Sequence, residues 1–338
     1  GGLTGIPECR KLMAEIVDVD EKNVILGGVA SLTLMYDYIS QCMVFGCGGN
    51  EPWIKQGEIK FLCPCPGYDR HFGILEHFGI KMINIKMNDD GPDMDAIEEY
   101  IKDESVKGLF CVPKYSNPDG ITFSDEVVRR FAALKPAAKD FRVIWDNAYI
   151  VHDLNDTPDK LLNIFDEAKK YGSEDMFIEV ISTSKISFAG GGISAVIASD
   201  ANIAEIKKRM SIQIISNDKI NQLRHARYFK NLDGIKAHMK KQAAILKPKF
   251  DAVTDGFEKA FDGTGIASWK KPNGGYFISL FVMNGCAKRV GQLCKEAGLT
   301  LTTVGATYPY GIDPDDSNIR IAPSYPDVDE LKKAVELL

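Results

Sequence analysis

The stretch MFIEVISTSKISFAGGGISAVIAS, residues 176–199, places a lysine between two apolar runs. The runs 176–182 and 193–199 have the length of β-strands and contain few polar residues, which is typical of strands covered on both faces. Lys185 follows the first run, after small hydroxyl residues, and precedes three glycines. Because a lysine normally lies on a solvated surface, its position just past a buried strand indicates a specific role.

The same pattern extends outward from this stretch. Apolar runs of strand length, each followed by an amphipathic segment or a loop and a helix, occur at 24–26, 59–64, 81–87, 106–113 and 141–146. Such alternation predicts an α/β fold with a mostly parallel central sheet and helices on both of its faces.

After about residue 219 the pattern changes. A long helical stretch, which we expect to be bent or broken near Gly234 and Pro248, leads into a smaller α/β layer. Its expected elements are 274–282, 287–298, 299–304, 317–323 and 327–338. We therefore expect a large domain over residues 1–240 and a small C-terminal domain over residues 241–338.

The composition excludes several classes of protein. The 338 residues carry a net charge of −6 and scattered basic residues, so we expect no nucleic-acid partner. No apolar run is long enough for a membrane span, and no signal peptide is evident. The eight cysteines lie in apolar contexts, and CPC at 63–65 lacks zinc-site spacing, so we expect reduced thiols, a cytoplasmic protein and no metal.

Ligands of open parallel sheets bind at the carboxyl ends of the strands. There the sequence places Tyr68, Asn117, Asp146 and Lys185, and a Gly-rich turn precedes a helix that starts near Ser31. A desolvated lysine is a nucleophile towards carbonyls, and a carboxylate can keep a pyridine nitrogen protonated. An aromatic ring can stack on that heterocycle, and a helix start can bind a phosphate. Together these groups predict a pyridoxal 5'-phosphate site.

The motifs NPDG at 117–120, DNAY at 146–149, STSK at 182–185 and NIRIAPS at 318–324 occur in an order that resembles the fold-type I pyridoxal phosphate-dependent aminotransferases. The strings ASLTLMYD, PGYDRHF, KISFAGGGIS, NQLRHARYF and PNGGYF are similar to the bacterial aspartate aminotransferase-like (class I/II, MocR-like) branch. The resemblance covers nearly the whole chain.

The resemblance implies a role for each matching residue. Lys185 would bond covalently to the cofactor and move the substrate's α-proton, Asp146 would pair with the pyridine nitrogen, and Tyr149 would donate to the phenolic oxygen. Further residues are implied as contacts: Asn117 to the same oxygen and to substrate, Tyr68 to the ring face, Ala30, Ser31, Ser182 and Ser184 to the phosphate, and Arg320 to the substrate α-carboxylate.

The sequence departs from the family pattern at one phosphate contact. Where many relatives have an arginine, eight residues past the lysine, this chain has Ile193. Backbone amides of the glycine run, or Arg224, would have to substitute. His71 and His225 are expected to be structural. The resemblance also implies an N-terminal arm, with a tyrosine that reaches the neighbouring subunit's phosphate, before the region where this sequence begins.

The function that the resemblance implies is transfer of an amino group between an amino acid and a 2-oxo acid. Aspartate and 2-oxoglutarate are the pair that the resemblance favours, and it implies a homodimer with shared active sites. Three alternatives stay open: a lyase or an aminotransferase of other specificity on the same fold, a regulatory module that binds the cofactor, and an inactive fragment.

Overall fold

The computed structural model describes residues 2–338. The helices are α1 (Pro7–Val17), α2 (Ser31–Phe45), α3 (Asp69–His77), α4 (Met94–Tyr100), α5 (Asp125–Ala132), α6 (Ile164–Lys169), α7 (Asp200–Gln213), α8 (Lys219–Phe229), α9 (Leu232–Phe261), α10 (Ala287–Glu296) and α11 (Val328–Leu337). The strands are β1 (Val24–Leu26), β2 (Lys60–Cys65), β3 (Lys81–Asn88), β4 (Gly91–Pro92), β5 (Val106–Cys111), β6 (Arg142–Asp146), β7 (Phe177–Ser182), β8 (Ser194–Ala198), β9 (Ala267–Trp269), β10 (Ile278–Val282) and β11 (Asn318–Ile321).

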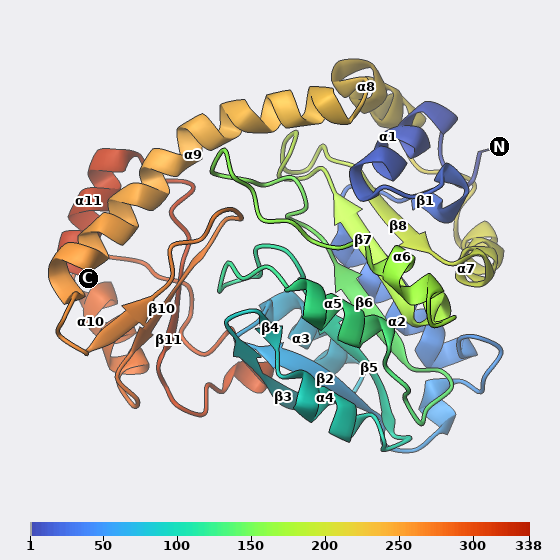
Figure 1. The fold of residues 1–338 in the computed structure, drawn as a ribbon, viewed down its shortest axis with the longest axis horizontal. Helices are drawn as coiled ribbons and strands as arrows, with labels where there is room; N and C mark the ends of the chain where they lie inside the picture. Colours follow the sequence, from blue (N-terminus) through green and yellow to red (C-terminus); the bar gives the residue numbers. More distant parts are fainter. Residues whose placement is uncertain (1) are drawn as a thin grey trace.

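Eight of these strands form one sheet in the order β1-β8-β7-β6-β5-β2-β3-β4. The five central strands from β7 to β3 are parallel, whereas β8, which follows the glycine run, returns antiparallel to β7. Crossover helices lie on both sides of the sheet, as Figure 1 shows. The predicted α/β fold with a mostly parallel sheet is therefore confirmed.

Side-chain alternation along the strands builds two cores. Leu62, Leu109 and Trp145 face one side, where helices α1, α4, α5 and α6 contribute to the same cluster. Their sequence neighbours Phe61 and Ile144 face the other side, towards α2, α3 and α7. This period of two decides on which face a polar residue at a strand end lies.

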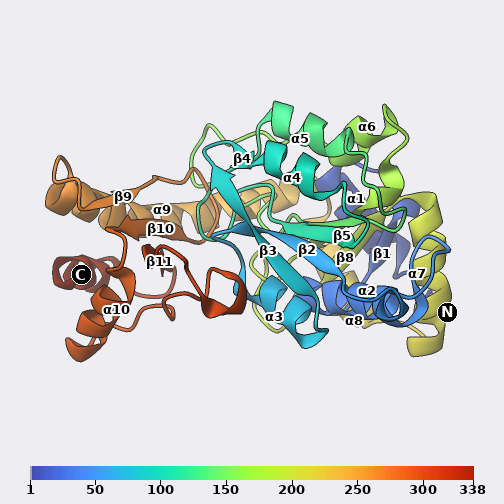
Figure 2. The same cartoon turned by 90° about the horizontal axis from the view of Figure 1, so that it is seen from below.

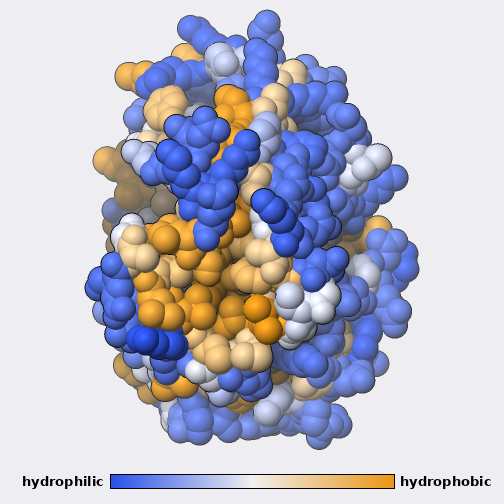
Figure 3. Space-filling model, turned by 90° about the vertical axis from the view of Figure 1, so that its left-hand side faces the viewer, coloured by the Kyte–Doolittle hydropathy of each residue, from blue (hydrophilic) through white to orange (hydrophobic). Residues whose placement is uncertain are grey.

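A second, three-stranded sheet lies beside the first, in the order β11-β10-β9, and all its strand pairs are antiparallel (Figure 2). Helices α9 and α11 pack on each other and share a core with this sheet. Figure 3 shows this end of the molecule, where an apolar area lies in a hollow ringed by hydrophilic residues. Exposed apolar side chains of the second sheet's helices and loops include Met283, Leu293 and Leu337.

The long helical stretch differs in detail from the prediction. Its break lies at Lys230–Asn231, where Lys230 adopts a φ of 67° and the Asn231 side chain caps α9 by accepting from the Gly234 amide. Helix α9 is 30 residues long, contains Pro248 in its interior, and curves from one sheet to the other (Figure 1). The stretch 299–304, all of it described, forms no strand; the third strand of the small sheet is β9.

The expected domain boundary at 240/241 falls inside α9, which packs against α8 and α1 at its start and against α11 further along. One helix thus runs through both layers. Within residues 2–338, no helix is long and apolar enough to cross a membrane.

Candidate active site

A cavity of about 190 Å³ opens at the carboxyl ends of the parallel strands. All nine residues that the sequence predicts as cofactor contacts line it: Ala30, Ser31, Tyr68, Asn117, Asp146, Tyr149, Ser182, Ser184 and Lys185. Leu32, Met35, Val112 and Ala148 complete the lining. The fold thus brings together five segments that are far apart in the sequence.

Strand alternation explains why two of these side chains meet. Asp146 ends β6, two residues after Ile144, and Ser182 ends β7, two residues after Val180. Ile144 and Val180 both belong to the core that faces α2 and α3. Both side chains therefore point to that face. The N-terminus of α2 and the start of α3 lie there, and they supply the other walls of the cavity.

Asp146 is held by a histidine that sequence reasoning set aside as structural. His71 Nε2 lies 2.9 Å from Asp146 Oδ2, and both side chains are buried. Because an ionised carboxylate only accepts, Nε2 carries the hydrogen in this bond. The His71 ring stacks on Phe110 with centroids 4.5 Å apart. Its position three residues after Tyr68, one helical turn along α3, was the available signal.

The other oxygen of this carboxylate is unpaired. Asp146 Oδ1 is buried and has no hydrogen-bond partner among residues 2–338. An unpaired buried acceptor costs free energy unless a ligand supplies a donor. A protonated ring nitrogen is such a donor, so this oxygen fits a pyridinium group.

Lys185 follows the end of β7 in the same cavity. The residue is solvent-accessible through the cavity mouth, but protein atoms surround its amine on most sides. This desolvation lowers the pKa of the amine, and the charge of Asp146 offsets only part of the effect. Lys185 Nζ lies 5.3 Å from the centroid of the Tyr149 ring. The Tyr276 hydroxyl donates to the Lys185 carbonyl oxygen at 3.2 Å.

Tyr149 belongs to a cluster of rings beneath the lysine. Its ring stacks on Tyr276 at 6.1 Å and meets His152 edge-on at 5.5 Å. Burial and then the Asp146 charge raise the pKa of Tyr149 well above its usual value, so the phenol is a donor at neutral pH. Burial, with the charge of Lys185, lowers the pKa of His152 to about 3, which keeps that ring neutral.

The glycine at position 274 allows this cluster to close. A Cβ there would lie 2.2 Å from a ring carbon of Tyr115 and 2.4 Å from the carbonyl oxygen of His152. The PNGGYF motif therefore approaches the site with its backbone, a path that only glycine permits.

The start of α2 provides unpaired amides. Ala30 precedes the helix and makes no side-chain cap hydrogen bond among the described residues. The Ser182 and Ser184 hydroxyls both donate to the Val29 carbonyl oxygen, at 3.1 Å and 3.0 Å, and so fix the turn before α2 against β7. Free amides at a helix N-terminus fit a phosphate group. Each serine hydroxyl has a single hydrogen, so Ser182 and Ser184 would have to turn from Val29 to donate to a phosphate.

The structure places Ile193, the departure from the family pattern, and Arg224, its possible substitute, as follows. Ile193 is buried in the core, and its amide donates to Thr183 Oγ1 at 2.8 Å. Arg224 is exposed, with its guanidinium 6.0 Å from the Phe188 ring, and it is not part of the cavity lining in the described chain. Gly192 packs on Ser184, since a Cβ there would lie 2.6 Å from the Ser184 amide nitrogen. The glycine run therefore lies against the hydroxyl segment.

Arg320 reaches the site from the small sheet. It lies on β11, its guanidinium is 5.0 Å from the Phe277 ring, and Nη1 donates to Asn117 Oδ1 at 3.2 Å. The same nitrogen donates to Asp69 Oδ1 at 2.9 Å. Because the Asn117 oxygen accepts from Arg320, its amide nitrogen is left to donate elsewhere. Asp69 and Phe277 were not predicted from the sequence.

Known proteins are similar to this chain in sequence and in fold. The aspartate amino-transferase family model matches residues 1–338. An aspartate aminotransferase of Corynebacterium glutamicum is 45% identical over 337 residues, which cover 99% of this chain and 78% of that protein. The crystal structure of an aspartate transaminase from the same species superposes with a TM-score of 0.98 at 45% identity, and the match covers 100% of this chain and 80% of that one.

A more distant structure shows the fold alone. An α-aminoadipate aminotransferase of Thermus thermophilus, solved with N-(5'-phosphopyridoxyl)-L-leucine, matches with a TM-score of 0.82 at 17% identity, over 100% of this chain and 81% of that one. The expected fold-type I architecture is thus confirmed. The family match over the whole length and the close relatives show that this chain is an aminotransferase of the aspartate amino-transferase family.

Proposed function

We propose that the chain binds pyridoxal 5'-phosphate and transfers the amino group of aspartate to 2-oxoglutarate. The observation that carries the cofactor assignment is the unpaired, buried Asp146 Oδ1 in the same cavity as the Lys185 amine. The substrates are proposed because the relative that is 45% identical is named an aspartate aminotransferase.

The residues of the cavity fit the parts of the cofactor. Asp146 would accept from the ring nitrogen and Tyr68 would cover one ring face. Asn117 and Tyr149 would donate to the phenolic oxygen, which suits a tyrosine whose pKa is raised. The start of α2 at Ala30 and Ser31 would hold the phosphate, together with the hydroxyls of Ser182 and Ser184 once these turn from the Val29 carbonyl oxygen. When bound, the cofactor supplies an electron sink for the bond-breaking step.

Lys185 has two tasks in this proposal. Its amine holds the cofactor covalently at rest, and desolvation favours the neutral nucleophilic form. The same amine would remove the proton from the substrate α-carbon and later return a proton. Tyr276 steadies the lysine backbone through its hydrogen bond to the carbonyl oxygen.

Arg320 binds the α-carboxylate of the substrate. A guanidinium offers a planar pair of donors, and the Phe277 ring beside it restricts its rotation. Arg320 also donates a hydrogen bond to Asn117, so the residue proposed to bind the substrate is directly linked to a residue proposed to contact the cofactor.

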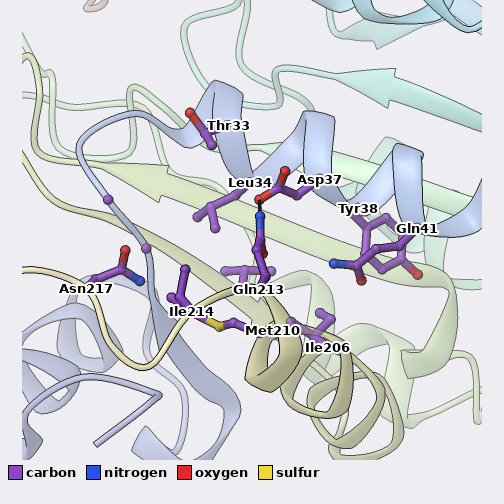
Figure 4. A pocket seen from close by; sticks show the side chains of 13 residues that line it. Thr33, Leu34, Asp37, Tyr38, Gln41, Ile206, Met210, Gln213, Ile214 and Asn217 are labelled. Atoms are coloured by element: carbon purple, nitrogen blue, oxygen red, sulfur yellow. Dashed lines mark hydrogen bonds between the residues drawn. The ribbon is translucent and has the colours of Figure 1, made fainter.

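A homodimer with shared active sites is part of the proposal. Ile212, Ile215 and Ile220, on and after α7, are 89%, 85% and 76% exposed. Ile212 and Ile215 flank Gln213 and Ile214 in the sequence, and these two line a cavity between α2 and α7, shown in Figure 4, where Gln213 donates to Asp37 Oδ2 at 3.0 Å. Since α2 begins at the proposed phosphate site, a second copy on this face would lie beside that site.

Two further points complete the proposal. The chain divides functionally into a cofactor-binding part over 1–240 and a small part over 241–338 that carries Arg320. A cytoplasmic location is supported by the eight cysteines, which are all free thiols within residues 2–338.

The test starts with the purified chain and pyridoxal phosphate. We expect the absorption band of the lysine-bound cofactor, its loss in Lys185→Ala, and its change on addition of aspartate. Without 2-oxoglutarate, aspartate should give at most one oxaloacetate per active site; continued turnover should require 2-oxoglutarate and follow ping-pong kinetics. Absence of the band would contradict the site, and turnover of aspartate without any oxo acid would favour a lyase. A band that no amino acid alters would favour a binding module or an inactive fragment.

Sedimentation of the loaded protein tests the dimer. Ile212→Asp should raise the dimer dissociation constant, whereas an unchanged sedimentation coefficient would argue against this face.

A further inference from the structure

The ion pair between Arg320 and Asp69 joins the two sheets at the active site. Arg320 lies on β11, and Asp69 is the first residue of α3, directly after Tyr68. Their Nη1 and Oδ1 atoms are 2.9 Å apart, and the side chains are 11% and 32% exposed. A carboxylate in the first turn of a helix is stabilised by the helix dipole, which favours Asp69 as a fixed acceptor.

The donors of the guanidinium can be counted. Nη1 has two hydrogens, and it donates to Asp69 Oδ1 and to Asn117 Oδ1. That nitrogen is therefore saturated. Arg320 Nε is buried and has no partner among residues 2–338. The parallel pair of donors left for a carboxylate is thus the side edge formed by Nε and Nη2.

From this count we propose that Asp69 is a positioning residue for substrate binding: it holds Nη1 so that the Nε–Nη2 edge of Arg320 faces the incoming α-carboxylate. The inference rests on the proposed role of Arg320. It deepens that role, because it states which edge of the guanidinium the substrate meets and which side chain selects that edge.

The opposite reading is that Asp69 occupies the place of the substrate carboxylate and must leave before binding. The two readings predict opposite signs. If Asp69 positions the guanidinium, its removal weakens the binding of carboxylates. If Asp69 competes, its removal strengthens that binding.

The experiment compares Asp69→Ala, Asp69→Asn and Asp89→Ala in the cofactor-loaded enzyme. Asn keeps an oxygen acceptor for Nη1 but loses the charge. Asp89 is a matched control, because its 2.6 Å ion pair with Lys270 also links the two sheets but lies outside the cavity lining. The readouts are KM and kcat for aspartate and 2-oxoglutarate, and the Kd of succinate, which has no amino group, from the cofactor spectrum.

For Asp69→Ala we expect KM for both substrates and the Kd of succinate to rise about tenfold, with kcat within about twofold of the parent. Asp69→Asn should restore both constants to within about threefold, because one hydrogen bond is rebuilt. Asp89→Ala should leave them unchanged, which separates positioning from simple tethering of the sheets.

Three results would overturn the proposal: lower KM and Kd in both Asp69 variants, unchanged constants in Asp69→Ala, or an equal rise in Asp89→Ala. A parent enzyme that loads the cofactor but does not transaminate would instead overturn the proposed function. The two failures are therefore distinguishable.

Discussion

Replacing His71 by Phe tests the contact that orients Asp146. Phenylalanine keeps the shape of the ring and its stacking on Phe110, but it removes the donor 2.9 Å from Asp146 Oδ2. Because Oδ1 has no partner among residues 2–338, the variant leaves both oxygens of a buried carboxylate unpaired before the cofactor binds.

The magnitude follows from that loss. A hydrogen bond to a charged group contributes about 1.5–3 kcal/mol. We therefore expect the free energy of unfolding without cofactor to fall by about 2 kcal/mol. In the loaded enzyme the carboxylate would no longer be held in one orientation against the ring nitrogen. A loss of about 2 kcal/mol in the chemical step corresponds to a decrease in kcat of roughly 30-fold.

Urea unfolding of the cofactor-free protein and steady-state kinetics at saturating pyridoxal phosphate measure the two effects. His77→Phe is the control, since it is the same substitution on the exposed side of the same helix. The reasoning is refuted if His71→Phe folds normally and keeps kcat within about threefold of the parent.

Three further substitutions have expected outcomes. Burial raises the pKa of Glu179 to about 8 from 4.5, so the unfolded chain loses this proton first, and the free energy of unfolding falls as pH rises from about 4.5 to 8. The free energy of unfolding of Glu179→Gln should therefore exceed that of the parent increasingly across that window, by about 3 kcal/mol at pH 7 in thermal unfolding. A difference that does not depend on pH would contradict the assignment. Gly274→Ala should lower the free energy of unfolding by about 2 kcal/mol or more, because its Cβ would meet Tyr115 at 2.2 Å. Gly73→Ala, in open space on α3, should raise the free energy of unfolding by about 0.5–1 kcal/mol. Equal melting temperatures of the two variants would count against this steric account. Ile193→Arg, which restores the residue that many relatives have, should lower the free energy of unfolding by several kcal/mol because it buries an unpaired charge, and a stable variant with tighter cofactor binding would disprove the prediction.

Strand ends were the most predictable part of this molecule. Mainly apolar runs such as 141–146 and 176–182, each followed by turn residues, favour buried strands, and parallel strands bring their carboxyl ends to one edge. Asp146 and Lys185 could therefore be placed near each other from the sequence, and the cavity contains both. The resemblance to known aminotransferases supplied the remaining candidates, including Arg320.

What could not be predicted depends on helix phase and on contacts between layers. His71 meets Asp146 because α3 starts at residue 69, and that orientation follows from packing rather than from local pattern. Asp69 acquires its partner from a strand 251 residues away. The break before α9 lies at Lys230–Asn231, close to Gly234 as expected, but the asparagine cap and the positive φ of Lys230 that form it were not predicted. Gly234 takes part as well, since a Cβ there would lie 1.8 Å from the Phe229 carbonyl oxygen.

The residue proposed to hold the cofactor ring and the residue proposed to bind the substrate carboxylate belong to different layers: Asp146 ends a strand of the large sheet, and Arg320 lies on the small one. If these roles hold, substitutions around β10 and β11 change how the substrate is bound while the residues proposed to hold the cofactor stay untouched. Such an arrangement separates the evolution of selectivity from the preservation of chemistry, and directed evolution of a new specificity should accumulate its changes beyond the middle of α9.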